Sequence, residues 1–427
     1  MADEEGAERR ATTDAPRVVT ANRAQLQLRP MDLDSLVATD HRARAIWMVV
    51  EGLDLGRFYE AIQARGSDPG RPAIDPKILL ALWLYATSEG VGSARELARL
   101  CERHDAYRWL CGGLRMNHHT LSDFRVEHGA ALDELLTQLL GVMLHQRLVR
   151  LERVTQDGMR VRARAGAASF RREPTLRRCL AEAQAQVAAL KEAGERPPDP
   201  QAVRRAAAAA RAAREREKRV TRALAELPAA RAVKRGDVAK AAARVSMTDP
   251  DAGVMKMADG GYRPAYNIQL ASAVEGRVIV GVQVTNAGTD LAQLTPMRTA
   301  VERRTGQPPR EYLVDGGLVV LDSIVAAAAD GVTVYAPVRA PQRADIDPHL
   351  PKPTDAPAVA AWRTRMGTAE AKAIYKDRAA VAETVNADLR THRGLDHLPV
   401  RGLAKVQCIA VWMALTYNVL RWLALSA

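Results

Sequence analysis

Two strand-like runs, far apart in the sequence, both end in the dipeptide Asp-Gly. The run 153–158 carries Asp157 at its end, and the run 312–317 carries Asp315. A third acidic residue, Glu383, lies in a helical stretch. Two carboxylates at strand ends and a third on a helix can converge on two divalent ions, which clamp the attacking and leaving oxygens of a phosphodiester. Oxygen ligands of this kind suit Mg²⁺.

The segments around these acids alternate between strand and helix patterns. Two runs joined at Glu275-Gly276 predict a hairpin, because Val278, Val280, Val282 and Val284 alternate as in a half-buried strand. The remaining expected elements are a helix over 291–304, a strand over 312–314, a helix over 324–329, a strand over 332–338 and a mostly helical part over 356–425. This order predicts an α+β domain with a mixed sheet and flanking helices, formed by residues 151–170 and 245–427.

Residues 31–150 predict a helical N-terminal domain, preceded by a flexible polar tail at residues 1–30. Asp75-Pro76 is a helix start, and Ser93 with Glu96 forms a capping box for the next helix. A bundle of short helices with so many basic residues predicts DNA contact, while a plain helical domain with solvated arginines is the alternative. The basic residues concerned are Arg71, Lys77, Arg95, Arg99, Arg103 and Arg125.

Residues 171–244 interrupt this strand-and-helix pattern and carry most of the net charge. They hold 19 Lys and Arg against 9 Asp and Glu, a surplus of +10, whereas the whole chain has a net charge of +12. Apolar residues step by three and four, which predicts a basic helical hairpin that turns at the Pro-rich stretch 194–200. The residues of this seam are Leu176, Leu180, Ala183, Val187, Leu190, Val203, Ala207, Ala210, Val220, Leu224 and Leu227. The hairpin either contacts the DNA backbone, contacts a second copy of the chain, or is a solvated spacer.

The overall charge and the four cysteines limit the classes of protein to which this chain can belong. The pI of about 9.8 suits a polyanionic partner. We expect no membrane helix and no signal peptide, and therefore a cytoplasmic protein. Four cysteines in 427 residues make no disulfide framework. We do not expect zinc at the group Cys101, His104, Cys111, His118 and His119, whose spacing fits no compact zinc pattern.

Several motifs together resemble the DDE transposases of bacterial insertion sequences, whose catalytic domain is RNase H-like. The resemblance covers nearly all of residues 30–425. It rests on Gln156–Ala163, Thr248–Ala252, Gly261–Gln269, Val314–Gly317, Tyr375-x-x-Arg378-x-x-x-x-Glu383, His392–Leu395 and Tyr417–Arg421, and on Gly70–Pro76 and His118–Arg125 in the N-terminal region. Arg390 stands where this family usually shows Lys.

The resemblance implies a transposase that binds the ends of an insertion sequence and performs metal-dependent DNA cleavage and strand transfer. It implies Asp157, Asp315 and Glu383 as catalytic metal ligands for Mg²⁺, or Mn²⁺ in its place. Tyr375, Arg378 and Arg390 would then position DNA phosphates. The expected partners are double-stranded DNA, at the terminal repeats and the target, and a second copy of the chain in the DNA complex, in a nucleoid-associated protein of the bacterial cytoplasm.

Three alternatives stay open. The first is a catalytically inactive or domesticated sequence-specific DNA-binding protein. The others are a structural or RNA-binding protein and a plain RNase H-like nuclease. Other acidic residues are second-line metal candidates: Asp249, Asp251, Asp259, Asp290 and Asp322. Asp249-Pro250-Asp251 is expected as a turn, and Asp290 as the cap of a helix that begins at Leu291.

Overall fold

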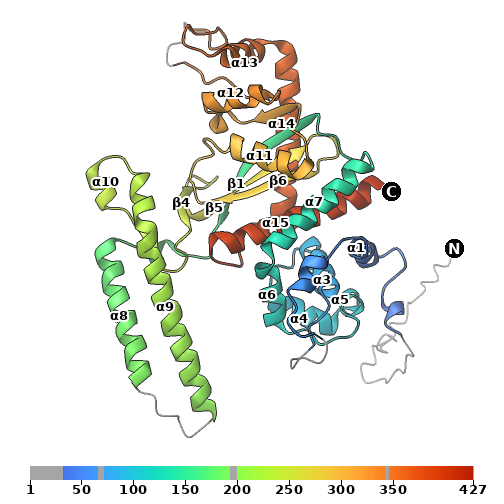
Figure 1. The fold of residues 1–427 in the computed structure, drawn as a ribbon, viewed down its shortest axis with the longest axis vertical. Coiled ribbons are helices and arrows are strands. Elements are labelled where there is room, and N and C mark those ends of the chain that lie inside the picture. The colour runs from blue at the N-terminus through green and yellow to red at the C-terminus, as the bar shows by residue number, and fades with distance from the viewer. Residues whose placement is uncertain (1–31, 66–71, 193–199, 342–345, 427) are drawn as a thin grey trace, which may run out of the picture.

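The computed structural model describes residues 32–65, 72–192, 200–341 and 346–426. The expected flexible tail at residues 1–30 lies outside this range. Figure 1 shows a central sheet, a set of N-terminal helices beside it and a long helical hairpin that projects away from it. The α+β class and the helical N-terminal region expected from the sequence are confirmed.

Short helices form the N-terminal region, each begun by a local capping group. The Asp75 carboxylate accepts from the backbone N–H of Lys77, and Ser93 Oγ accepts from that of Glu96 at 3.3 Å, as the helix-start patterns predict. The helices are α1 (Arg42–Glu51), α2 (Gly56–Glu60), α3 (Pro76–Ser88), α4 (Ala94–Arg103), α5 (Asp105–Leu110), α6 (His118–Glu127) and α7 (Gly129–His145), after a 3₁₀ turn η1 (Asp34–Leu36).

The second region is built on a mixed sheet with the strand order β4-β5-β1-β7-β8, in which β6 also pairs with β5. The pairs β1–β5, β4–β5 and β5–β6 are antiparallel, while β1–β7 and β7–β8 are parallel. The strands are β1 (Arg153–Arg162), β4 (Gly253–Lys256), β5 (Tyr262–Ala273), β6 (Ile279–Thr285), β7 (Glu311–Val314) and β8 (Thr333–Tyr335). The expected β5–β6 turn is confirmed, and its Gly276 has a left-handed φ of 77°.

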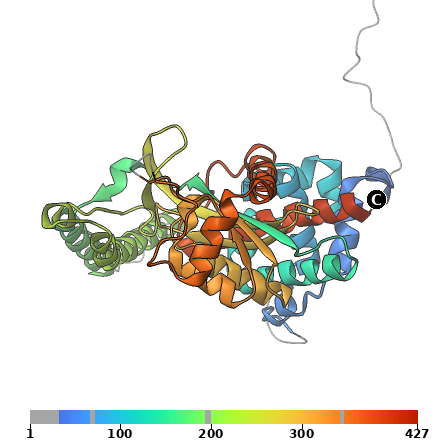
Figure 2. The same cartoon turned by 90° about the horizontal axis from the view of Figure 1, so that it is seen from above.

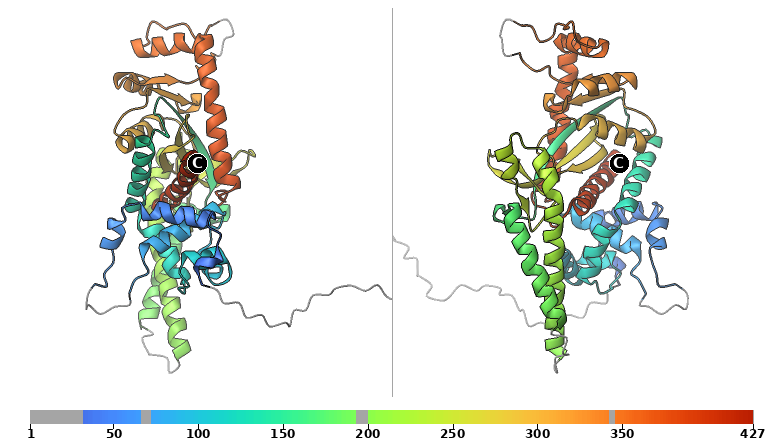
Figure 3. Two further views of the ribbon diagram at one scale, coloured as in Figure 1. Left: turned by 90° about the vertical axis from the view of Figure 1, so that its right-hand side faces the viewer. Right: turned by 60° about the vertical axis from the view of Figure 1, so that its left-hand side comes forward.

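Helices flank this sheet on both sides. The connecting helices are α11 (Leu294–Thr305), the 3₁₀ turn η3 (Gly316–Leu318) and α12 (Leu321–Ala329). They are followed by α13 (Pro357–Gly367), α14 (Ala369–Thr391) and α15 (Leu403–Ser426). In Figure 3, α14 runs along the sheet as one long helix. It contacts β1, β5, β7 and β8, so its inner face covers the strands that carry the candidate acids.

α15 joins the two regions into one hydrophobic core. It packs against β6 on one side and against α3, α6 and α7 on the other, and the buried residues of both regions form a single cluster. Trp412 is 1% exposed, and its Nε1–H donates to the backbone oxygen of Arg125 at 3.0 Å. The N-terminal helices therefore depend on α15 to complete their core.

By length and composition alone, α15 is long and apolar enough to span a membrane. Within the described residues it is the single helix that passes this test, and 67% of its most apolar window is buried inside the protein. A core helix of this kind passes the same test, so the finding is weak evidence for a membrane.

The basic hairpin, residues 171–244, forms two long helices, α8 (Glu173–Glu192) and α9 (Pro200–Ala232), as predicted. They run antiparallel, because Glu173 pairs with Arg231 and Glu182 with Arg216. The base is completed by η2 (Ala167–Ser169), α10 (Asp237–Ala241) and the two-stranded pair β2 (Phe170–Arg171) and β3 (Val245–Ser246). Figure 2 shows the hairpin at one end of the molecule and the N-terminal helices toward the other.

The apolar seam of the hairpin is buried only near its base. Leu176 and Ala183 are fully buried against Val220 and Leu227. Beyond this point the expected seam opens, and Val203 is 41% exposed. The physical reason is that α9 offers only alanines over 206–210, too small to fill the space between two helices.

Candidate functional site

Asp157 and Asp315 lie next to each other on adjacent parallel strands. The register pairs Gln156 of β1 with Val314 of β7, and each is followed directly by one of the two aspartates. Asp315 ends its strand as predicted. Asp157 does not, because β1 continues unbroken to Arg162.

β5 pairs with β1 on both sides of Asp157-Gly158, so this dipeptide forms no turn, and Gly158 instead leaves room for neighbouring side chains. A Cβ atom on Gly158 would lie 2.3 Å from both Asp290 Oδ1 and Gln269 Nε2, so only glycine leaves room for these side chains. Asp290 Oδ1 accepts from the side-chain amides of Asn267 and Gln269 at 2.6 Å each. The expectation that Asp290 caps a helix at Leu291 was wrong, because the helix begins at Leu294 and the carboxylate serves this polar cluster instead.

Two side chains from α14 hold the carboxylate of Asp157. Arg378 Nη2 donates to Asp157 Oδ1 at 2.8 Å and lies 3.7 Å from Asp315 Oδ2. Asn386 Nδ2 donates to Asp157 Oδ2 at 2.9 Å. The guanidinium of Arg378 therefore lies between the two candidate metal ligands, and Asn386 fixes the other oxygen of Asp157.

The sequence analysis missed Asn386, although a signal for it existed. Arg378 and Asn386 are eight residues apart, which places them about 80° apart around a helix at roughly 100° per residue. A polar amide on the same face as the Arg of the motif was therefore a candidate for contact with Asp157.

Burial and neighbouring charges set the electrostatics of this cluster. Burial raises the pKa of the Asp157 carboxyl above its ordinary value, Arg378 opposes this rise, and the negative charges of Asp290 and Asp315 add to it. Burial also raises the pKa of the Tyr375 hydroxyl, which Arg378, Asp315 and Asp157 all influence electrostatically. Tyr375 therefore belongs to the same cluster.

An ion-pair brace fixes α14 against the two strands. Arg153 of β1 binds Glu311 of β7 at 2.6 Å and also pairs with Asp377 of α14. Asp377 directly precedes Arg378, so these ion pairs help to fix the position of Arg378 relative to the two aspartates.

Glu383 does not join this cluster. It is exposed on α14, about 60° around the helix from Asn386, and makes no ion pair or hydrogen bond with the described part of the chain. Arg390 is half-buried and likewise has no recorded partner there. Among the described residues, no group of three or more His, Cys, Asp and Glu is close enough to hold a metal ion.

Two aspartates nevertheless fit a divalent cation. Both already face one cation, the guanidinium of Arg378, and their oxygens are the hard donors that Mg²⁺ and Mn²⁺ prefer. The third carboxylate of the expected triad would have to turn inward from the outer side of α14.

The second-line acids have structural partners. Asp249 Oδ1 accepts from the backbone N–H of Gly402 at 3.0 Å, and Asp251 Oδ2 from that of Leu403 at 2.7 Å, so the two carboxylates cap the start of α15. Asp251 also pairs with Arg222 of the basic hairpin. The Thr-Asp-Pro-Asp-Ala stretch therefore ties the hairpin to α15.

The remaining acidic and sulfur-containing candidates lie apart from the aspartates. Asp259 pairs with Arg263 at 2.6 Å, and Asp322 is exposed in the first turn of α12. Cys101 and Cys111 are buried free thiols, and His104 Nδ1 accepts from a backbone N–H to cap α5.

Two family models match the chain. Residues 31–127 match the Transposase domain (DUF772), and residues 351–423 match the Transposase DDE domain. No curated protein and no solved structure matches the chain. Asp157 and Asp315 lie between the two matched segments, whereas Tyr375, Arg378 and Glu383 lie inside the second.

The fold and the two matches indicate the class of protein: a transposase with a helical N-terminal region and a sheet-containing DDE domain. Both matches are to transposase domains, and together they support a DDE transposase of an insertion sequence. This family implies a nucleic-acid-cleaving enzyme that acts on DNA and generally uses a divalent metal.

Proposed function

We propose that this transposase binds the ends of its insertion sequence and catalyses metal-dependent strand cleavage and transfer. The observation that carries the proposal is the parallel register of β1 and β7, which sets Asp157 and Asp315 side by side facing Arg378. A divalent ion held there would stabilise the attacking and leaving oxygens of an in-line displacement.

The residues of the chain have separate tasks in this proposal. Asp157 and Asp315 would hold the ion, and Glu383 would complete the set. Arg378 and Asn386 keep the Asp157 carboxylate in a fixed orientation through hydrogen bonds to its two oxygens. Tyr375 and Arg390 would position DNA phosphates, and a guanidinium can bind a phosphate with two parallel hydrogen bonds.

The partners follow from the same proposal. The helical N-terminal region would contact the terminal repeats, and the basic hairpin would contact the DNA backbone. Two copies would assemble on the two element ends in the bacterial cytoplasm. The net charge of +12 supports a polyanionic partner of this kind.

A catalytically inactive DNA-binding protein is the second candidate. The observation in its favour is the exposed position of Glu383, which leaves two carboxylates where the family motif provides three. The two candidates differ in one measurable property, cleavage of a bound element end.

The test compares cleavage and binding on DNA that contains the element end, in Mg²⁺ and in Mn²⁺. Asp157→Asn, Asp315→Asn and Glu383→Gln should each abolish cleavage while DNA affinity stays unchanged. Asp322→Asn is the matched control, because this acid is exposed in the first turn of α12 and, within the described residues, does not share the Arg378 partner of Asp157 and Asp315.

Two outcomes would contradict the proposal in different ways. Cleavage at the wild-type level in Glu383→Gln would remove Glu383 from the catalytic set. Tight binding of element ends by a wild-type protein that never cuts them would establish the inactive candidate.

A further inference from the structure

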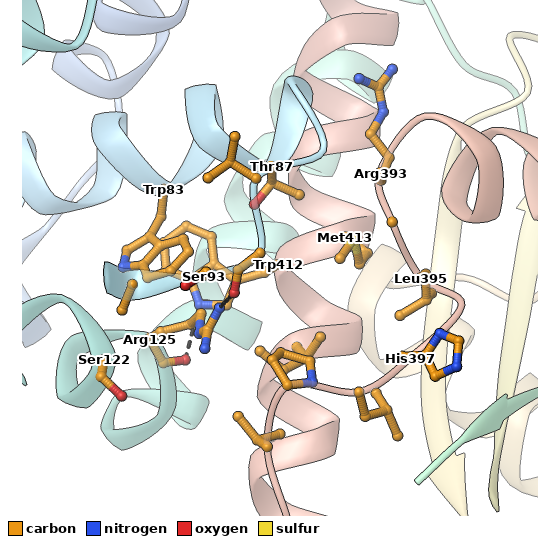
Figure 4. A pocket seen from close by; sticks show the side chains of 18 of the residues that line it. Trp83, Thr87, Ser93, Ser122, Arg125, Arg393, Leu395, His397, Trp412 and Met413 are labelled. Atoms are coloured by element: carbon orange, nitrogen blue, oxygen red, sulfur yellow. Dashed lines mark hydrogen bonds between the residues drawn. The ribbon is translucent and has the colours of Figure 1, made fainter. Parts of the chain in front are cut away.

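A cavity of about 680 Å³ lies between the N-terminal helices and the segment that links α14 to α15. Figure 4 shows its walls: Trp83, Ser93 and Arg125 on one side, and Arg393, Leu395 and His397 on the other. We call it the arginine cavity. It lies outside the Asp157 cluster, and none of the residues assigned above to catalysis lines it.

Arg125 is buried in the wall of this cavity, and none of the described acidic residues pairs with it. It is only 6% exposed, and its guanidinium carbon lies 4.3 Å from the centre of the Trp83 ring. Nη1 donates to the backbone oxygen of Gly92, while the buried Nε has no hydrogen-bond partner among the described residues. A buried cation without an acid is costly, and burial lowers the pKa of the Arg125 guanidinium to about 10.

The rest of the lining strengthens this positive charge. Four arginines and three histidines line the cavity, and none of its lining residues is Asp or Glu. Arg393 is neutralised by Asp388 at 3.2 Å. Arg164, in contrast, is exposed, and within the described part of the chain its side chain donates to a single group, the backbone oxygen of Pro399. It lies close enough to Arg125 to disfavour its charge further.

The start of α4 adds backbone donors. Ser93 caps this helix, and Ser93, Ala94 and Arg95 all line the cavity. Figure 4 shows the Ser93 side chain beside the Arg125 guanidinium. A helix N-terminus carries a partial positive charge and free N–H groups, and both favour a bound anion.

The cavity continues into a second depression of about 710 Å³ on the N-terminal helices. The two share Arg95 and His118, and the second adds Arg99, Arg115 and one acid, Glu102. Arg99 pairs with Glu96 at 2.6 Å, so the second depression is less positive than the arginine cavity.

We propose that the arginine cavity binds a phosphate of the DNA backbone, held by Arg125, Arg164 and the start of α4. The bound phosphate would supply the counter-ion that Arg125 lacks. It would also bridge the N-terminal helices and the segment that follows α14. DNA bound there would therefore contact the segment directly after the helix that carries Arg378. The inference that the ligand is a phosphate rests on the cavity alone. The inference that this phosphate belongs to DNA rests on the proposed function.

The first arm of the test measures inorganic phosphate on the full chain by calorimetry and by thermal unfolding. Wild-type protein should bind phosphate saturably and unfold at a higher temperature in its presence. Arg164→Gln should weaken phosphate binding at least about tenfold, since a hydrogen bond to a charged group contributes roughly 1.5–3 kcal/mol. Arg125→Lys is a second variant, which keeps the positive charge but loses the planar guanidinium and its paired N–H donors. Arg310→Gln is the matched control, because Arg310 is an exposed arginine whose side chain pairs with Glu152 far from the cavity.

The second arm measures affinity for an element-end duplex against salt. Arg164→Gln should lower the slope of the logarithm of the binding constant by about 0.9, the value for one lost phosphate contact. Wild-type phosphate binding that is absent, or unchanged in both Arg164→Gln and Arg125→Lys, overturns the cavity as a phosphate site. Phosphate binding without any change in the DNA slope overturns DNA as its source. Such a result leaves the proposed function untouched, whereas wild-type protein that does not bind DNA at all refutes the proposed function.

Discussion

Replacing Arg378 with Gln should strengthen the binding of a divalent ion at Asp157 and Asp315. In the structure the guanidinium lies 2.8 Å from one aspartate and 3.7 Å from the other, so it occupies the side on which a metal ion would bind. Two like unit charges about 4 Å apart repel by roughly 1 kcal/mol in water and roughly 4 kcal/mol at an effective dielectric constant of 20.

The expected magnitude lies in the lower part of this range. The side chains of Arg378 and Asp157 are 14% and 23% exposed, so water reaches the pair and screens it. We expect a gain of about 2 kcal/mol, which corresponds to a roughly 30-fold lower dissociation constant. Cleavage should fall in the same variant, because Arg378 also orients Asp157.

The assay is calorimetric titration with Mg²⁺ and Mn²⁺ at about pH 8, where carboxyls are ionised even though the loss of Arg378 raises the pKa of Asp157 further. Arg390→Gln is the control on the same helix. Asp157→Asn should lose the binding. A dissociation constant for Arg378→Gln within about threefold of wild type would refute the idea that Arg378 and the ion compete for the same carboxylates.

Three further predictions follow from other parts of the molecule. The first variant replaces Arg204, Arg205, Arg211 and Arg214 of α9 with Gln. It should lower the salt slope of DNA binding by about 0.9 per lost phosphate contact, equally for two unrelated duplexes. An unchanged slope would favour the spacer or dimer alternatives. Asp249→Asn should gain stability relative to wild type as pH rises above about 4 in urea unfolding. Burial raises the pKa of Asp249 in the folded state, so its favourable protonated form is lost as pH rises through that pKa, whereas Asn stays neutral; a difference that does not vary with pH would contradict this. Trp412→Ala should lower the free energy of unfolding by about 3–5 kcal/mol, and tryptophan fluorescence and circular dichroism should show both regions unfolding in one transition; two separate transitions would refute the shared core.

The sequence predicted helices and strands well because their signals are local. The caps at Asp75 and Ser93 and the alternating valines of β6 depend on neighbouring residues alone, and the structure places each element close to its expected position. The antiparallel basic hairpin was predictable for the same reason.

The errors arose where distant residues decide the outcome. Asp157-Gly158 has the local signature of a turn, but β5 pairs with β1 on both sides of it and keeps the strand continuous. Asp249-Pro250-Asp251 forms the expected turn, in which the N–H of Ala252 donates to the backbone oxygen of Asp249 at 3.1 Å. What local sequence could not reveal is that the two carboxylates also cap a helix that begins at Leu403.

The candidate site was predictable only in part. The register of β1 and β7 joins the two aspartates as the resemblance implied, and Arg378 lies with them. The sequence could not reveal that Arg378 stands between them while Glu383 faces outward, because the rotation of α14 depends on tertiary contacts such as the Arg153–Asp377 pair.

The position of α15 has a consequence for how the chain folds during synthesis. α15 follows every other described helix and strand in the sequence, yet it covers the apolar faces of α3, α6 and α7. At about 5–20 residues per second, the ribosome needs more than roughly ten seconds between completing α6 and beginning α15. Throughout that interval the N-terminal helices expose a surface that is buried only in the finished molecule. We therefore expect chaperones that bind apolar helices to bind nascent chains of this protein. Expression at a lower growth temperature should raise the fraction recovered in folded form.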